Sequence, residues 1–145
     1  MSSIWSDLEG LLPRVSKPAR YIGLEDGMQI PEHEPHRVAW LLAYPDTYEI
    51  GLPNQGLQIL YEILNERDDA VAERTYAPWV DLDAELRRHG LPLFSVDTHR
   101  PASDFDVLAF NLSAELVYTN VLNMIDLAGA PIRQADRGDG DPFVI

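Results

Sequence analysis

Arg37-Val-Ala-Trp-Leu-Leu-Ala-Tyr44 is a continuous run of mostly apolar residues that Pro45 closes. Its length and composition are typical of a strand buried on both faces, as in a parallel sheet. Asp106-Val-Leu-Ala-Phe-Asn111 predicts a second buried strand of the same kind. These two runs decide the fold class, because parallel strands need long crossover connections that are usually helical.

The segments around these strands alternate between helical and strand-like patterns. Leu57, Leu60, Tyr61 and Leu64 form an apolar stripe at helical spacing. This alternation predicts βαβ units and therefore a three-layer α/β domain with a mostly parallel sheet. The predicted strands are residues 37–44, 71–76, 93–96 and 106–111, and the predicted helices are residues 55–67, 78–90 and 115–128.

The first 36 residues have a different character from the rest of the chain. Residues 1–16 predict a short amphipathic helix with Ile4, Leu8, Leu11 and Leu12 on one face. Residues 17–36 are polar and rich in Pro and Gly, which indicates an arm with short edge strands at 21–23 and 28–30. We therefore divide the chain into an N-terminal helix and extended arm (1–36) and an α/β domain (37–145).

Composition excludes several function classes. The 145 residues include 11 basic and 24 acidic side chains, a formal charge of −13, which argues against direct nucleic-acid binding. No cysteine is present, so a thiol nucleophile and a Cys-ligated cluster are excluded from this chain. No apolar run approaches the roughly 20 residues of a membrane span, and the first residues lack a signal peptide. A cytoplasmic location is expected.

Candidate binding residues follow two of the predicted strands. Ligands of open α/β sheets bind outside the carboxyl ends of the strands. We expect the segments after residues 44 and 110 to line a cleft there by hydrogen bonding, without catalysis. The candidates are Tyr44, Asp46, Tyr48, Glu49, Gly51, Asn54, Asn111, Ser113, Glu115 and Tyr118.

Other motifs give weaker indications of chemistry. Gly51-x-x-x-x-Gly56 is half of a phosphate-binding loop without its Lys and Ser/Thr, so a tight turn with close helix packing is the alternative. Asp46 and Glu115 would make a carboxylate pair only if the fold brings them together. Glu32-His-Glu-Pro-His36 resembles a metal-binding cluster or a solvated loop. The helix at 115–128 carries a polar stripe that reads as a solvated face or as one wall of the cleft.

Several blocks in order resemble the start of a group of bacterial radical SAM proteins. They are Arg20-Tyr-Ile-Gly23, Tyr44-Pro-Asp-Thr-Tyr-Glu-Ile-Gly-Leu-Pro-Asn-Gln-Gly-Leu-Gln-Ile-Leu-Tyr61, Glu73-Arg-Thr-Tyr-Ala-Pro-Trp79, Pro92-Leu-Phe-Ser95, Phe105-Asp-Val-Leu-Ala-Phe110 and Glu115-Leu-Val-Tyr-Thr-Asn-Val-Leu-Asn-Met-Ile-Asp-Leu-Ala-Gly129. The resemblance covers residues 17–145, and the last block is the most specific.

The resemblance implies a cobalamin-binding-like, Rossmann-like domain that precedes a radical SAM barrel in the same longer chain. That barrel would hold the [4Fe–4S] cluster and S-adenosylmethionine. Asp141-Pro-Phe-Val-Ile145 resembles a strand leading toward the barrel, which indicates a piece of a longer chain, with a short terminal strand as the alternative. The cobalt-ligating Asp-x-His-x-x-Gly pattern is absent after the first strand. Asp97-Thr-His-Arg-Pro-Ala102 is similar to it but follows a later segment, and we interpret this as a coincidence.

Three hypotheses about function follow. The first is an accessory domain that binds cobalamin, or part of an unknown substrate, beside the barrel. The second is a degenerate interaction module without a cofactor, which docks a barrel or a partner protein through the N-terminal helix. The third, a small acidic hydrolase, lacks a recognisable nucleophile, metal set or activated base.

Overall fold

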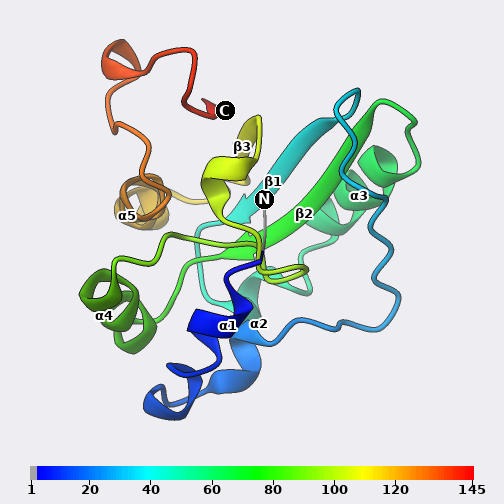
Figure 1. The fold of residues 1–145 in the computed structure, drawn as a ribbon. Coiled ribbons are helices and arrows are strands. Elements are labelled where there is room, and N and C mark those ends of the chain that lie inside the picture. Colours follow the sequence, from blue (N-terminus) through cyan, green and yellow to red (C-terminus); the bar gives the residue numbers. More distant parts are fainter. Residues whose placement is uncertain (1–2) are drawn as a thin grey trace.

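The computed structural model describes residues 3–145 and contains one sheet of four parallel strands in the order β2-β1-β3-β4 (Figure 1). This confirms the predicted α/β class. All seven residues of β1 pair with β2, and four of them also pair with β3 on the other side. The strands are β1 (Val38–Tyr44), β2 (Ala70–Tyr76), β3 (Val107–Phe110) and β4 (Phe143–Val144).

Helices cover both faces of the sheet. The helix α3 (Gln55–Asn65) lies on one side, whereas α4 (Val80–His89) and α5 (Tyr118–Leu127) lie on the other (Figure 1). A one-turn helix α2 (Tyr48–Gly51) connects β1 to α3. Short 3-10 turns complete the chain, namely η3 (Ala102–Asp104), η4 (Glu115–Val117) and η5 (Gln134–Asp136). None of the described helices has the length and apolar character needed to cross a membrane.

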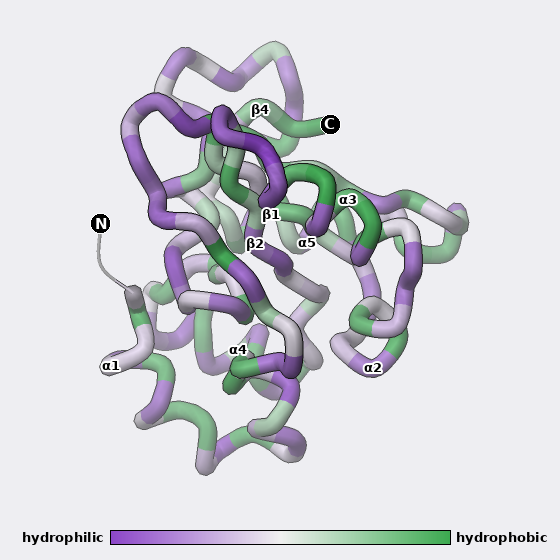
Figure 2. Tube along the Cα trace, turned by 90° about the vertical axis from the view of Figure 1, so that its right-hand side faces the viewer, coloured by the Kyte–Doolittle hydropathy of each residue, from purple (hydrophilic) through white to green (hydrophobic). Residues whose placement is uncertain are grey.

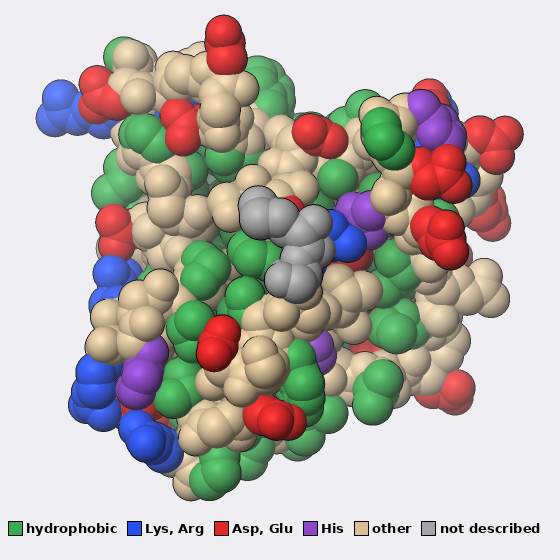
Figure 3. All heavy atoms as spheres, viewed as in Figure 1, with side chains coloured by type: hydrophobic (Ala, Val, Ile, Leu, Met, Phe, Trp, Pro, Cys, Tyr) green, Lys and Arg blue, Asp and Glu red, His purple; other side chains and the backbone are tan. Residues whose placement is uncertain are grey.

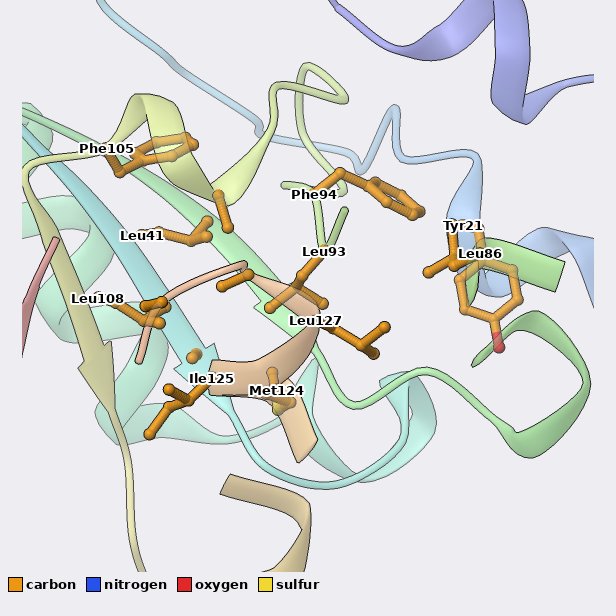
Figure 4. Packing of buried hydrophobic residues seen from close by; sticks show 14 of the residues in the cluster. Tyr21, Leu41, Leu86, Leu93, Phe94, Phe105, Leu108, Met124, Ile125 and Leu127 are labelled. Atoms are coloured by element: carbon orange, nitrogen blue, oxygen red, sulfur yellow. The ribbon is translucent and has the colours of Figure 1, made fainter. Parts of the chain in front are cut away.

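Two hydrophobic clusters fill the spaces between these layers. The larger one joins Leu41 of β1 to side chains of α4 and α5 (Figure 4), and the smaller one joins Leu42 to Leu57 and Tyr61 of α3. Leu41 and Leu42 are consecutive residues, and they are 0 % and 3 % exposed on opposite faces. The apolar run of β1 is therefore buried on both faces, as predicted.

The N-terminal segment differs from the predicted single helix. It forms one turn of α-helix, α1 (Trp5–Leu8), followed by the 3-10 turn η1 (Leu12–Arg14) with Pro13 inside it. Proline removes a backbone donor, which favours this short geometry. Leu8, Leu11, Leu12 and Val15 are buried, and all of these except Leu11 belong to the larger cluster. The segment is therefore part of the core, which argues against the N-terminal helix as a separate docking element.

The arm forms neither of the two edge strands predicted for it. Tyr21 ends the 3-10 turn η2 (Pro18–Tyr21), and residues 28–30 have no regular structure. Gly23 instead has a φ of +72°, and a Cβ there would lie 2.0 Å from the carbonyl oxygen of Val96. A glycine is required at this point because the arm touches the backbone of a distant segment.

The remaining predictions need smaller corrections. Residues 93–96 form a single bridge, Phe94 to Pro101, in place of a strand. The predicted helix at 115–128 begins as η4 and becomes regular only from Tyr118. The helix predicted at 55–67 ends at Asn65. The last residues pair with β3 and are hydrophobic up to the C end (Figure 2).

Candidate functional site

Four of the candidate residues meet at the carboxyl ends of β1 and β3. The hydroxyl of Tyr44 lies 3.4 Å from that of Ser113, which donates to Oδ1 of Asn111 at 3.1 Å. Nδ2 of Asn111 donates to Oδ1 of Asn54 at 3.3 Å. Oδ1 of Asn54 also caps α3 by accepting from the backbone N–H of Leu57. These residues lie together because β1 and β3 are parallel neighbours whose carboxyl ends share one edge.

Gly51 belongs to the same edge, and its role is packing. A Cβ at this position would lie 2.3 Å from Cδ1 of Tyr76 and 3.0 Å from Cβ of Tyr44. The absent side chain lets α2 approach the ends of β1 and β2 closely. The geometry at Gly51 agrees with the tight-packing interpretation.

Tyr48 and Glu49 turn away from the edge toward the arm. The Tyr48 hydroxyl donates to the carboxylate of Glu25, and burial together with this bond raises the pKa of Tyr48. Glu49 is exposed and pairs with Arg20 and Lys17. The hydrogen bond from Arg20 lowers the pKa of Glu49 to about 2. Both side chains hold the arm in place and do not line a cleft.

No hydrogen bond joins Asp46, Glu115 and Tyr118 to one another among the described residues. The carboxylate of Asp46 accepts from the backbone N–H of Thr47. Glu115 and Tyr118 are exposed, and neither side chain makes a hydrogen bond with another described residue. The hypothesis of a carboxylate-pair hydrolase therefore gains no support from the arrangement of Asp46 and Glu115.

The polar stripe on α5 ties two helices together. Arg87 of α4 donates to Asp83, Asn123 and Asp126, with distances between 2.7 and 2.8 Å. Asn123 also donates to Asp83. The later half of the stripe is thus a partly solvated contact between α4 and α5, and it does not face the carboxyl ends of the strands.

The cobalamin-like pattern at residues 97–102 has a structural role. Asp97 is buried against Arg74, and Nε2 of His99 lies 2.8 Å from the carbonyl oxygen of Tyr21. The His99 ring is 8 % exposed and lies between the rings of Trp5 and Phe94. Its contacts leave no open imidazole, which agrees with the interpretation as a coincidence.

The histidines of the arm have partners as well. Nε2 of His33 lies 2.6 Å from the carboxylate of Glu73, and His36 contacts Glu34 and the backbone of Asp68. Within residues 3–145, no group of three or more His, Cys, Asp or Glu side chains is arranged to hold a metal ion. Residues 32–36 therefore form no such group in this structure, and their side chains contact neighbouring residues of the fold.

Sequence reasoning missed a buried polar network along the outer edge of β2. Glu73 accepts from Ser95 and Thr98 and contacts His33, while Nη2 of Arg74 donates to Asp97 at 2.6 Å. Burial alone would raise the pKa of Glu73, but these bonds and the charge of His33 hold it below the ordinary value. The one available signal is a pair of adjacent opposite charges inside an otherwise buried strand.

The segment carrying Ser95 and Asp97 takes the place of a further strand beside β2. The backbone N–H of Val96 donates to the carbonyl of Arg74 at 2.9 Å, and Thr75 donates to the carbonyl of Phe94. Oδ2 of Asp97 accepts from the backbone N–H of Arg74. These contacts satisfy backbone groups that an open sheet edge would expose.

Comparison with known proteins identifies the family. Residues 56–145 match the family model described as "Radical SAM proteins, N-terminal". The match covers more than half of the chain, including nearly all of α3, all of the sheet except β1, and most of the polar network. No curated protein and no solved structure gives a significant match.

Proposed function

Since the chain belongs to the family of N-terminal domains of radical SAM proteins, we propose that it is a non-catalytic accessory domain that packs on the catalytic part of such a protein. The contact would be made by the carboxyl-end edge of the sheet, with Tyr44, Asn54, Asn111 and Ser113 lining a shared cleft. The radical chemistry would belong to the catalytic part, because this chain has no cysteine to hold an iron–sulfur cluster.

The observation that carries this proposal is the uncovered apolar segment beside the polar residues. Leu116 is 93 % exposed, and Leu112, Tyr118 and Leu122 are each about half exposed. Leu112 lies between Asn111 and Ser113 in the loop before η4, Leu116 lies on η4, and Tyr118 and Leu122 lie on the first half of α5. A cluster of exposed apolar side chains around polar groups is typical of a protein–protein contact.

The residues at this edge do not fit a cobalamin held through a protein ligand. Asp46 and Gly51 match the ends of the cobalt-ligating pattern, but Tyr48 stands in the place of the histidine. The phenol of Tyr48 is bound to Glu25, and the pKa of Tyr48 is raised. The histidines contact other partners: His33 contacts Glu73, His36 contacts Glu34, His89 contacts Glu85, and His99 contacts Tyr21. Binding of cobalamin by hydrogen bonds alone would have to use Tyr44, Asn54, Asn111 and Ser113.

The docking proposal is tested by measuring association between this domain and the separately produced catalytic part of its protein. Leu116→Lys should raise the dissociation constant at least about tenfold, because it places a charge at the centre of the apolar contact. Ile59→Lys is the matched control, since Ile59 is a half-exposed apolar residue on the outward face of α3. Equal weakening by both variants, or none by Leu116→Lys, would refute this docking surface.

The cobalamin question is tested separately. The pure domain is mixed with hydroxocobalamin and passed through a desalting column, and the absorbance of the corrin is followed in the protein fractions. We expect no corrin absorbance in the protein fractions. Co-elution that Asn111→Ala and Ser113→Ala abolish would instead establish cobalamin as the occupant of the cleft.

A further inference from the structure

A cavity of about 590 Å³ lies between the arm and α3, beside β2 and away from the predicted cleft. This volume falls in the range of small-molecule sites. Its walls come from residues 26–31 of the arm and from one face of α3. The polar side chains that matter for recognition are Asp26, Gln58, Glu62, Glu66 and Arg74.

Arg74 supplies a hydrogen-bond donor to the cavity. Its side chain is 4 % exposed, and its guanidinium stacks 4.2 Å from the centre of the Tyr61 ring. Nε and Nη2 donate to Asp97, whereas Nη1 donates to no described residue. Nη1 is not fully buried, and Arg74 is one of the residues that line the cavity. A ligand atom there would be a carboxylate oxygen or a similar acceptor.

The opposite charges come from three carboxylates. Asp26, Glu62 and Glu66 form no ion pair with any residue in 3–145. Oε1 of Gln58 adds another acceptor, since its Nε2 is already bound to the carbonyl of Leu52. In Figure 3, acidic side chains gather at the upper right of the molecule, where the end of the arm and the loop after α3 lie in Figure 1. Arg74 is neutralised by Asp97, so the cavity as a whole favours a cation.

The position of Glu62 and Glu66 is unfavourable for the helix itself. They are four residues apart at the end of α3, where like charges repel and the helix macrodipole is negative. Neither carboxylate has an ionic partner among the described residues that would offset this repulsion. A bound ammonium group would offset it, which is a physical reason to regard the pair as part of a binding site.

We propose that this cavity binds a basic α-amino acid, with its carboxylate on Nη1 of Arg74 and its side-chain ammonium between Glu62 and Glu66. Asp26 and Oε1 of Gln58 remain as acceptors for the α-ammonium group. A nucleotide or other phosphate compound is disfavoured, because the three carboxylates would repel it. This inference is independent of the docking function proposed above.

Amide chemical-shift titrations of the isotope-labelled chain with three compounds test the assignment. L-lysine carries all three groups, cadaverine lacks the carboxylate, and L-norleucine lacks the side-chain ammonium. L-lysine should give saturable shifts in residues 26–31 and 58–66, and the other two compounds should bind at least fivefold more weakly. Absence of saturable shifts with L-lysine up to about 10 mM, roughly tenfold above a dissociation constant of about 1 mM, would overturn the proposal.

A double variant separates binding from folding. Glu62→Gln combined with Glu66→Gln should weaken L-lysine binding at least fivefold, while the midpoint of thermal unfolding rises or stays unchanged because a repulsion has been removed. Glu32→Gln is the control, since Glu32 is an exposed acidic residue of the arm outside the cavity wall. Unchanged binding in the double variant, or equal loss in the control, would refute the assigned contacts.

Discussion

The outer edge of β2 and the carboxyl-end edge of the sheet use similar polar residues in opposite ways. Glu73 and Arg74 of β2 are buried, as is Asp97. Arg74 donates to Asp97, and Glu73 accepts from Thr98. At the carboxyl ends, Asn111 and Ser113 are joined by longer bonds and lie beside exposed apolar side chains. Buried and paired groups stabilise one conformation, whereas exposed groups remain available to a partner. The first edge therefore holds the fold, and the second is where we place the function.

Removing residues 1–16 should have the largest effect on stability, because this segment contributes buried apolar side chains to the core. Leu8, Leu11, Leu12 and Val15 would leave the core, at a cost of roughly 1.5–3 kcal/mol each for complete burial. The sum approaches the whole stability of about 5–15 kcal/mol that is usual for a domain. Circular dichroism on heating should show no cooperative transition. A truncated chain that still unfolds cooperatively within a few degrees of the parent would restore the segment as a separate docking element.

Asp97→Ala should cost about 3–5 kcal/mol, because it leaves the Arg74 guanidinium buried without its partner. The free energy of unfolding in urea measures this loss. Asp69→Ala, which breaks the exposed pair with Arg67, serves as the control and should leave the unfolding midpoint unchanged. Equal midpoints for the two variants would mean that the β2 edge is not the stabilising one.

Glu73→Gln should cost about 1–3 kcal/mol at neutral pH, since Ser95, Thr98 and His33 lose a charged acceptor. The pKa of Glu73 is lowered in the folded protein, so its stabilisation is present above the ordinary value of 4.5 and is lost as the pH falls below it. The free energy of unfolding should therefore fall less steeply in acid for Glu73→Gln than for the parent. Identical pH profiles would contradict the role of this carboxylate.

Asn54→Ala tests the residue at the carboxyl-end edge of the sheet that also caps a helix. It removes the cap of α3 and should cost about 1 kcal/mol, whereas Asn54→Ser should keep most of the stability because serine also caps helices. Chemical unfolding of both variants checks this. A loss well above 2 kcal/mol would mean that the bond to Asn111 is as important as the bonds along β2.

Ser113→Ala should have the smallest effect, within about 0.5 kcal/mol, since the hydroxyl is exposed and its bonds to Tyr44 and Asn111 are long. Thermal unfolding of the variant beside the parent measures it. A loss above about 1 kcal/mol would show that the carboxyl-end edge of the sheet stabilises the fold as the outer edge of β2 does, and the contrast between the two edges would disappear.

The elements predicted correctly are those with a complete local signal. β1 and β3 are apolar runs without interruption, and α3 begins at residue 55, where its apolar stripe predicted a helix. The prediction for the arm is wrong at residues 21–23 and 28–30, because an edge strand requires a neighbour that the local sequence does not specify. Part of the candidate site follows from strand polarity, which brings Tyr44 and Asn111 to one edge.

The amino-acid sequence by itself determined the α/β class, the family resemblance and the residues at the carboxyl ends of the strands. The class and the residues at the strand ends depend on hydrophobic periodicity and on the polarity of parallel strands, whereas the resemblance depends on particular residue blocks in order. Only the tertiary structure decided that Asp97 pairs with Arg74, that Tyr48 faces the arm and that α3 borders a cavity. Those contacts join residues far apart in the chain, and their geometry depends on how loops cross the sheet edge.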